Sequence, residues 1–168
     1  GNGKGPELEI ALDPLEGTTI CATGGYNATS VMAIGRKDCL LHAPDIYMNK
    51  IAVGAIGKGI VDIQVSPTEN LKRLAEAKKC KIEDLTAIVL DRPRHEELIA
   101  EIRSAGARIN LIGDGDVSAA LACCSERSGI DILFGIGGAP EGVIAAAALQ
   151  CIGGDFQGIL TTTKPEQE

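Results

Sequence analysis

The chain has 168 residues, 45% of them hydrophobic, a length that fits one domain or one lobe and part of another. Its net charge is −7, and it has no run of Lys and Arg, which excludes a typical nucleic-acid-binding surface. No stretch reaches the ~18 apolar residues of a membrane span, and no signal peptide is evident. The six cysteines form no C-x-x-C pair, so we expect them to be reduced thiols. Together these features predict a cytoplasmic protein without a nucleic-acid or membrane partner.

The first third of the chain predicts short strands joined by tight turns. Strands are expected at residues 7–12, 28–34 and 39–42, with turns at 24–25 and 36–38. Residues 45–53 could form a short helix, 54–59 form a connector punctuated by glycine, and 60–65 are strand-like. We therefore expect residues 1–65 to form a partial N-terminal lobe with an antiparallel or mixed sheet, bounded near residues 66–68.

Residues 66–168 show a different pattern, in which helices and strands alternate. Helices are expected at residues 69–80, 93–105, 117–124 and 140–150, with Thr68 as the first N-cap, and strands at 86–90, 108–112 and 130–134. This alternation predicts an α/β lobe with a mostly parallel sheet covered by helices. In such sheets ligands bind beyond the carboxyl ends of the strands, which directs attention to three loops.

A turn directly after the first predicted strand carries two carboxylates and a hydroxyl. Asp13-Pro-Leu-Glu-Gly-Thr18 offers Asp13, Glu16 and Thr18 on a sharp corner. Magnesium prefers oxygen ligands, and one or two carboxylates with a substrate phosphate complete its shell. Pro14 and Gly17 also suit an ordinary β-turn, so the motif alone leaves a structural turn and a metal site open.

The loop at residues 91–95 places two arginines at the start of a predicted helix. Arg92 and Arg94 are unfavourable beside the positive end of a helix dipole unless an anion binds there. A sugar phosphate would suit both the guanidinium groups and the free helix amides. The alternative is that the arginines form surface ion pairs with Glu96 or Glu97.

The other two loops carry acidic residues among glycines. Asp114-Gly115-Asp116 could accept hydrogen bonds from sugar hydroxyls, or could simply form an N-cap with a turn glycine. Residues 135–142 end with Pro140 where a dinucleotide fingerprint needs Gly or Ala, and Glu141 would repel a pyrophosphate. Glu141 is therefore better explained as a metal ligand. His42 and His95 are not spaced as a metal-binding pair, and both are interpreted as structural.

Five blocks, at residues 13–18, 42–48, 91–97, 113–116 and 135–142, resemble the class II fructose-1,6-bisphosphatases, including the bifunctional forms that also act on sedoheptulose 1,7-bisphosphate. The resemblance covers essentially all of residues 6–160. It implies a layered αβαβα fold of the lithium-sensitive phosphatase type. It also implies hydrolysis of the 1-phosphate of a sugar bisphosphate with Mg²⁺ or Mn²⁺.

The resemblance also implies roles for individual residues. The implied metal ligands are Asp13, Glu16 and Glu141, and the implied catalytic residues are Asp13, Glu16 and Thr18. The implied substrate-binding residues are Glu16, Gly17, Thr18, Tyr47, Arg92, Pro93, Arg94, Asp114, Gly115, Asp116 and Gly138. Relatives often have Asp at position 16, and glutamate is one methylene longer.

The family places further metal-binding and catalytic carboxylates, and a lysine, ahead of the first block and continues beyond the last one. Because the chain opens on Gly1 rather than Met, we expect it to be part of a longer protein, which itself is expected to be a homo-oligomer. Two alternatives are an inositol-monophosphatase-like enzyme and a truncated, non-catalytic phosphosugar-binding module. The first has a second metal motif that contains Trp, which this chain lacks.

Overall fold

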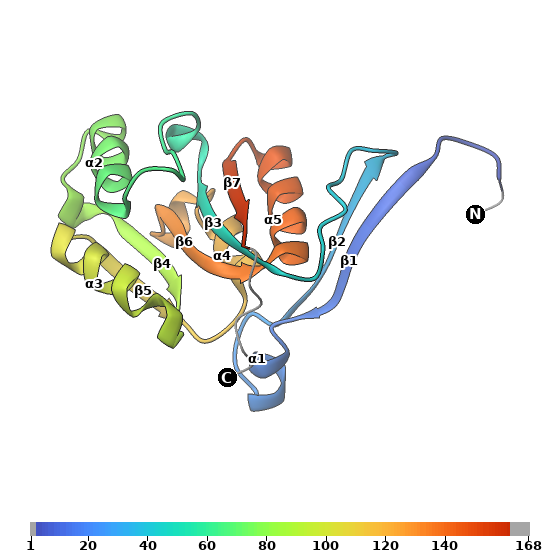
Figure 1. Ribbon diagram of the computed structural model, residues 1–168, viewed down its shortest axis with the longest axis horizontal. Coiled ribbons are helices and arrows are strands. Elements are labelled where there is room, and N and C mark those ends of the chain that lie inside the picture. The colour runs from blue at the N-terminus through green and yellow to red at the C-terminus, as the bar shows by residue number, and fades with distance from the viewer. Residues whose placement is uncertain (1–2, 162–168) are drawn as a thin grey trace.

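A computed structural model describes residues 3–161 of the chain (Figure 1). The strands are β1 (Leu8–Glu16), β2 (Thr29–Arg36), β3 (Tyr47–Val53), β4 (Thr86–Leu90), β5 (Arg108–Ile112), β6 (Ile132–Gly138) and β7 (Asp155–Leu160). The α-helices are α1 (Thr18–Thr23), α2 (Pro67–Lys78), α3 (Glu96–Ala105), α4 (Asp116–Ala122) and α5 (Ala139–Ile152). Short 3-10 helices are η1 (Ala55–Gly57), η2 (Ile82–Asp84), η3 (Pro93–His95) and η4 (Glu126–Ser128). Within the described residues, no helix has both the length and the apolar character needed to cross a membrane.

Five strands form the central sheet in the order β5-β4-β6-β3-β7. β4 is parallel to β5 and to β6, whereas β3 is antiparallel to both β6 and β7. The four strands from the second half of the chain therefore run in one direction, and β3 alone runs against them. The predicted α/β class is confirmed, and the strands of the second half are parallel to one another; the sheet as a whole is mixed because β3, from the first part of the chain, lies between β6 and β7.

The helices cover both faces of this sheet (Figure 1). On one face α2 and α3 bury Leu71, Leu74 and Ile102 in a core with alternate residues of β3, β4 and β6. On the other face α4 and α5 pack through Ala120 and Leu149 against the opposite side chains of the same strands. This opposition follows from the period-2 alternation of side chains along a strand.

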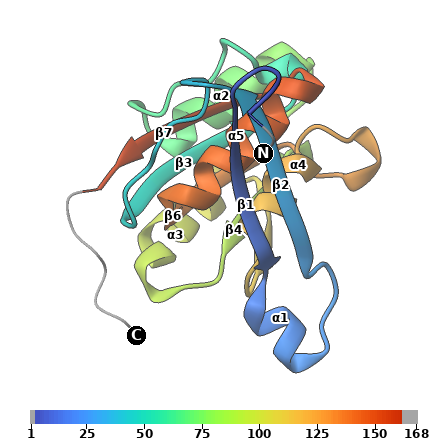
Figure 2. The same cartoon turned by 90° about the vertical axis from the view of Figure 1, so that its right-hand side faces the viewer.

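A second, two-stranded sheet lies outside α5. β1 and β2 pair antiparallel and pack on α5, away from the five-stranded sheet (Figures 1 and 2). The described residues thus stack as a helix pair, a sheet, a helix pair and a hairpin. The carboxyl end of β1 projects past α5 toward the ends of β4 and β6, and Glu16 is carried to that position.

Several predicted elements were correct in type. Strands β4 and β5 have the predicted bounds, and β1, β2, β6 and the four helices lie within a few residues of theirs. Helix α2 begins earlier than expected, because Ser66 rather than Thr68 is the N-cap and accepts a hydrogen bond from the amide of Glu69. Pro67 then occupies the first turn, where its missing N–H costs nothing.

Three predictions in the first part of the chain were wrong. Residues 45–53 form no helix, because residues 47–53 pair along both edges as β3. Residues 39–42 have no strand partner and form an irregular connection from β2 to β3.

Residues 60–65 form turns instead of a strand. Asn70 and Gln157 replace the strand partner there, since their amides bind the backbone of Val61, Asp62 and Ile63. Helix α1 and strand β7 were not predicted.

Candidate active site

A cavity of about 200 Å³ opens where the carboxyl ends of β1, β4 and β6 meet the starts of α4 and α5. Eight of the predicted site residues line it: Asp13, Glu16, Gly17, Thr18, Asp114, Asp116, Gly138 and Glu141. Leu15, Leu90 and Gly137 complete the wall. Acidic residues from the early turn and from the late glycine loop therefore share one cavity, at the sheet edge that the strand order predicts.

Glu16 is the most deeply buried acid of this cavity, with 4% of its surface exposed. Its Oε1 accepts a 3.4 Å hydrogen bond from the amide of Val117 at the start of α4, and its Oε2 is buried without a hydrogen-bond partner. Burial raises the pKa of Glu16 to about 7, and repulsion by Asp116 adds to that rise. A carboxylate in this position needs either a proton or a cation near neutral pH.

Glu141 lies in the first turn of α5 and has the second orphaned oxygen. Its Oε2 is buried without a hydrogen-bond partner and folds back over Gly138. A Cβ atom added at position 138 would lie 1.9 Å from this oxygen, so only glycine leaves room for the carboxylate. Gly138 therefore makes space for a protein carboxylate in the place where a dinucleotide loop would admit a pyrophosphate.

Asp116 is held by a lysine that the sequence reasoning missed. Lys50 on β3 is 3% exposed, and its Nζ lies 2.6 Å from Oδ2 of Asp116. Gly137 lies beside this ion pair, since a Cβ atom there would be 2.6 Å from the same oxygen. The one signal in the sequence is a lone lysine within the apolar segment 46–53, and nothing in that segment names its partner.

The early turn is tied to the Asp114 loop. Oδ1 of Asp13 accepts a hydrogen bond from the amide of Leu15, and Oδ2 of Asp114 accepts one from the amide of Thr19. Gly17 caps α1 with φ 82° and Gly115 caps α4 with φ 89°, both in the left-handed region that favours glycine. The segment is therefore a structural turn that also presents Asp13, Glu16 and Thr18 to the cavity.

The remaining predicted residues do not line this cavity. Arg94 donates two hydrogen bonds to the carbonyl of Ile136, at 3.1 and 2.9 Å, and its guanidinium lies 4.9 Å from the ring centroid of Tyr47. Arg92 donates to the carbonyl of Asp91, and Pro93 begins η3. Among the described residues, no ion pair joins either arginine to Glu96 or Glu97, which removes that alternative. Gly115 lines a neighbouring cavity of about 500 Å³ together with Asp114.

His95 is structural, as the sequence analysis interpreted it. Its Nδ1 lies 2.7 Å from the carbonyl of Leu90, and its Nε2 accepts a 2.8 Å hydrogen bond from the amide of Ile136. Burial lowers the pKa of His95, in keeping with a neutral ring that uses both nitrogens. The ring joins the end of β4 to β6 and fixes the segment on which Arg94 rests.

The cavity fits part of the coordination shell of a divalent cation. Two buried carboxylate oxygens, one from Glu16 and one from Glu141, have no hydrogen-bond partner, and oxygen ligands of this kind suit Mg²⁺ or Mn²⁺. Across residues 3–161, however, no three His, Cys, Asp or Glu side chains converge closely enough to hold a metal ion by themselves. The described residues thus supply some ligands without enclosing the ion.

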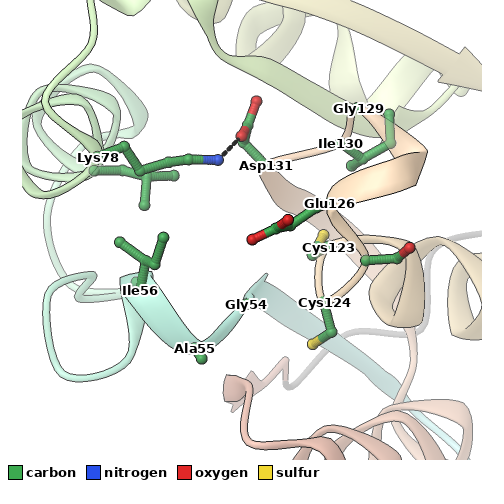
Figure 3. Close-up of a pocket in the computed structure, with 13 residues that line it drawn as sticks. Gly54, Ala55, Ile56, Lys78, Cys123, Cys124, Glu126, Gly129, Ile130 and Asp131 are labelled. Carbon is green, nitrogen blue, oxygen red and sulfur yellow. Dashed lines mark hydrogen bonds and ion pairs between the residues drawn. The ribbon is translucent and has the colours of Figure 1, made fainter.

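A second cavity, of about 330 Å³, lies at the opposite end of β6 (Figure 3). Lys78 and Asp131 form an ion pair on its wall, and the Glu126 carboxylate projects into the cavity below them. None of the predicted site residues lines this cavity. Lys78 and Glu126 can therefore serve as control positions for mutations of a lysine or a glutamate in the candidate site.

Comparison with known proteins identifies the family. The family model described as "Bacterial fructose-1,6-bisphosphatase, glpX-encoded" matches residues 1–168. Proteins named D-fructose 1,6-bisphosphatase class 2/sedoheptulose 1,7-bisphosphatase are 54% identical over 158 residues in Synechococcus elongatus and 51% identical over 160 residues in Prochlorococcus marinus. These alignments cover 94% and 95% of this chain but 46% and 48% of the relatives, so the chain spans about half their length. The chain therefore belongs to the family of bacterial, glpX-encoded fructose-1,6-bisphosphatases.

Proposed function

We propose that this chain forms one part of a metal-dependent phosphatase that removes the 1-phosphate of fructose 1,6-bisphosphate. The observation that carries the proposal is the pair of buried, unpartnered carboxylate oxygens of Glu16 and Glu141 in one cavity. The names of the relatives make sedoheptulose 1,7-bisphosphate the second substrate to test. Family membership favours these sugar bisphosphates over inositol monophosphates.

Asp13, Glu16 and Glu141 would hold Mg²⁺ or Mn²⁺ in this proposal. When bound, such a cation supplies an activated water and offsets charge on the phosphate oxygens. Thr18 and Gly17, on the same cavity wall, would border the phosphate that is removed.

The sugar and its far phosphate would lie along the loops that follow β4 and β5. Asp114, Gly115 and Asp116 would receive hydrogen bonds from sugar hydroxyls. Arg94, with Arg92, Pro93 and Tyr47, would bind the far phosphate. A guanidinium that is already fixed by Ile136 and stacked on Tyr47 loses little freedom when an anion arrives. Gly138 completes this side of the pocket.

The five-layered αβαβα arrangement and a homo-oligomer in the cytoplasm are also proposed. The outer face of the hairpin supports a further layer, because Leu8, Ile10, Leu12, Met32 and Ile34 are each between 55% and 61% exposed on it. A face of this kind normally packs against another element or a partner. The six cysteines are all free thiols, in keeping with a reducing compartment.

The test replaces Glu141 by Gln in a protein of full family length. A suitable protein is a chimaera in which this chain replaces the matching segment of the Synechococcus elongatus relative, studied beside the chain alone. Glu141→Gln keeps the size of the side chain but removes a charged ligand, so we expect phosphate release with Mn²⁺ to fall by ~100-fold or more.

Glu126→Gln, in the opposite cavity, is the matched control and is expected to keep wild-type turnover. Circular dichroism of both variants checks the fold. Turnover of Glu141→Gln close to that of the wild type would remove Glu141 from the metal site and with it the main support of the proposal.

A phosphosugar-binding module is the second candidate, because the described residues do not enclose a metal ion by themselves. Calorimetry of the 168-residue chain with fructose 1,6-bisphosphate, with and without Mn²⁺, separates the two. Metal-independent binding by the chain, together with a chimaera that releases no phosphate, would favour the module.

A further inference from the structure

Lys50 is a buried cation to which the proposed reaction gives no role. Its ammonium group meets Asp116 at the base of a cavity whose wall contains five carboxylates: Asp13, Glu16, Asp114, Asp116 and Glu141. Among the described residues that line this cavity there is no lysine or arginine. Lys50 reaches Asp116 from β3, and its ion pair with Asp116 is the contact that links this acidic wall to a cation.

Two glycines make the space through which Lys50 reaches Asp116. A Cβ atom at position 137 would lie 3.2 Å from Nζ of Lys50, and one at position 142 would lie 3.4 Å from its Cε. The first position is on β6 and the second is in the first turns of α5. The stem of Lys50 therefore runs between a strand and a helix that both have glycine at the point of contact.

Stability alone explains this arrangement poorly. Removing a lysine and an aspartate from water is expensive, and buried ion pairs are often no more stable than apolar residues of the same size. The pair does have a local effect, because Asp116 is the first residue of α4 and faces Glu16 in the same cavity. Without a fixed partner, the Asp116 carboxylate would be free to turn away from its neighbouring acids.

We propose that Lys50 is a positioning residue of the phosphatase site, which acts through Asp116 by fixing that carboxylate in the cavity wall. This inference rests on the proposed function and adds to it a residue that contacts neither metal nor substrate. Asp116 would present its carboxylate to the sugar hydroxyls only in the orientation that Lys50 sets.

The experiment is a double-mutant cycle in the chimaera, with Lys50→Met, Asp116→Asn and the two combined. Loss of a residue that orients a site group typically lowers activity by ~10–100-fold, so we expect Lys50→Met to reduce kcat/KM for fructose 1,6-bisphosphate by ~10-fold or more. It should divide this loss between kcat and KM in the same proportion as Asp116→Asn. If Lys50 acts through Asp116, the combined variant should fall no more than about twofold below Asp116→Asn.

Lys78→Met is the matched control, since it removes the other part-buried lysine–aspartate pair, in the opposite cavity (Figure 3). It is expected to leave kcat and KM unchanged even if it lowers the melting temperature. Where Lys50→Met does not fold, Lys50→Gln keeps a hydrogen-bond donor and takes its place in the same cycle.

The outcomes separate the inference from the function beneath it. An active wild-type chimaera whose Lys50 variant keeps its kcat and KM overturns the inference alone. Losses that add in the combined variant, or a loss matched by Lys78→Met, show a structural role for Lys50 and also overturn it. A wild-type chimaera that releases no phosphate overturns the proposed function and this inference together.

Discussion

Glu16 is a residue in which burial and like charge act in the same direction. Desolvation and then Asp116 raise its pKa, and the amide of Val117 opposes them only in part. The acid is therefore partly protonated near neutral pH. If Glu16 is a metal ligand, as proposed, proton and cation would compete for its carboxylate oxygens.

We predict that the metal-free chain loses stability as the pH rises from about 4.5 to 7. In the unfolded chain Glu16 ionises near pH 4.5, whereas in the folded chain its pKa is about 7, so only the unfolded state gains from deprotonation within this window. The loss is up to roughly 3 kcal/mol if the whole shift is realised. Urea unfolding in EDTA across this range measures it.

Glu16→Gln is the control for this prediction, because it removes the titrating group and should flatten the corresponding part of the curve. His95 acts in the opposite sense. Its folded pKa is lowered, so the stability that it contributes is lost as the pH falls below about 6.5. Subtracting the pH dependence of the free energy of unfolding of Glu16→Gln from that of the wild type leaves the contribution of Glu16. If this contribution stays constant from pH 4.5 to 7, the prediction is contradicted.

The residues of the site differ in how far the sequence could reveal them. Asp13, Glu16, Asp116 and Glu141 stand in loops rich in glycine beside predicted strands, and the structure brings them to one cavity. Lys50 could not be found in this way, because its partner is 66 positions away and their meeting depends on β3 lying beside β6. Which of these residues do chemistry stays a prediction.

At the scale of elements, the local sequence pattern was enough to predict a strand where the pattern fits a strand and not a helix. β4 (TAIVL) is a short, mostly apolar run followed by Asp91, β5 (RINLI) alternates polar and apolar residues before Gly113, and their predicted bounds are the observed ones. The segment of β3 shows no apolar–polar alternation, since Asn49 and Lys50 are adjacent and the apolar residues 51–53 follow them, so its periodicity cannot distinguish a buried strand from a helix. Pairing with β6 and β7, which come from the second half of the chain, decides the question.

We predict that Gly137→Ala in β6 destabilises the chain by about 1–3 kcal/mol, the usual cost of overpacking. The new Cβ atom would lie 2.6 Å from Oδ2 of Asp116 and must displace the ion pair with Lys50. Gly113→Ala is the matched control, because a Cβ atom there meets nothing within 4 Å. Urea unfolding of both variants is the measurement, and equal stabilities would show that the ion pair moves without cost.

At the scale of the whole molecule, the hairpin of β1 and β2 is apolar on the side away from α5. Alternate residues of each strand are exposed there, and Ile10 and Ile34 lie opposite each other in the pair. The relatives have more than twice the aligned length. The division of the chain near residue 66 stays a prediction, although β3 from the first part lies in the main sheet.

We predict that Ile10→Lys with Ile34→Lys affects the chain and the chimaera differently. In the chain alone both side chains are exposed, so the free energy of unfolding should change by no more than about 0.5 kcal/mol. In the chimaera, where this face would be covered, burying two lysines should cost at least about 2 kcal/mol. Thermal unfolding of both proteins measures the difference.

Ile56→Lys is the control for this comparison, since Ile56 has a similar exposure (54%) but lies in η1, far along the chain from the hairpin. Both proteins should tolerate it. A chimaera as stable with the hairpin lysines as without them would show that no further layer packs on this face.

The place of β3 in the sheet has a consequence for synthesis on the ribosome. Its two neighbours are β6 and β7, so a nascent chain that has emerged only to residue 130 carries β3 with both edges unpaired. Such a strand is prone to associate with other chains. Helices α2 and α3 can form as they emerge, but β3 gains its partner β6 only when residues 132–138 arrive and its second partner β7 only when residues 155–160 arrive. Until then β3 is an unpaired strand that association with another chain could cover.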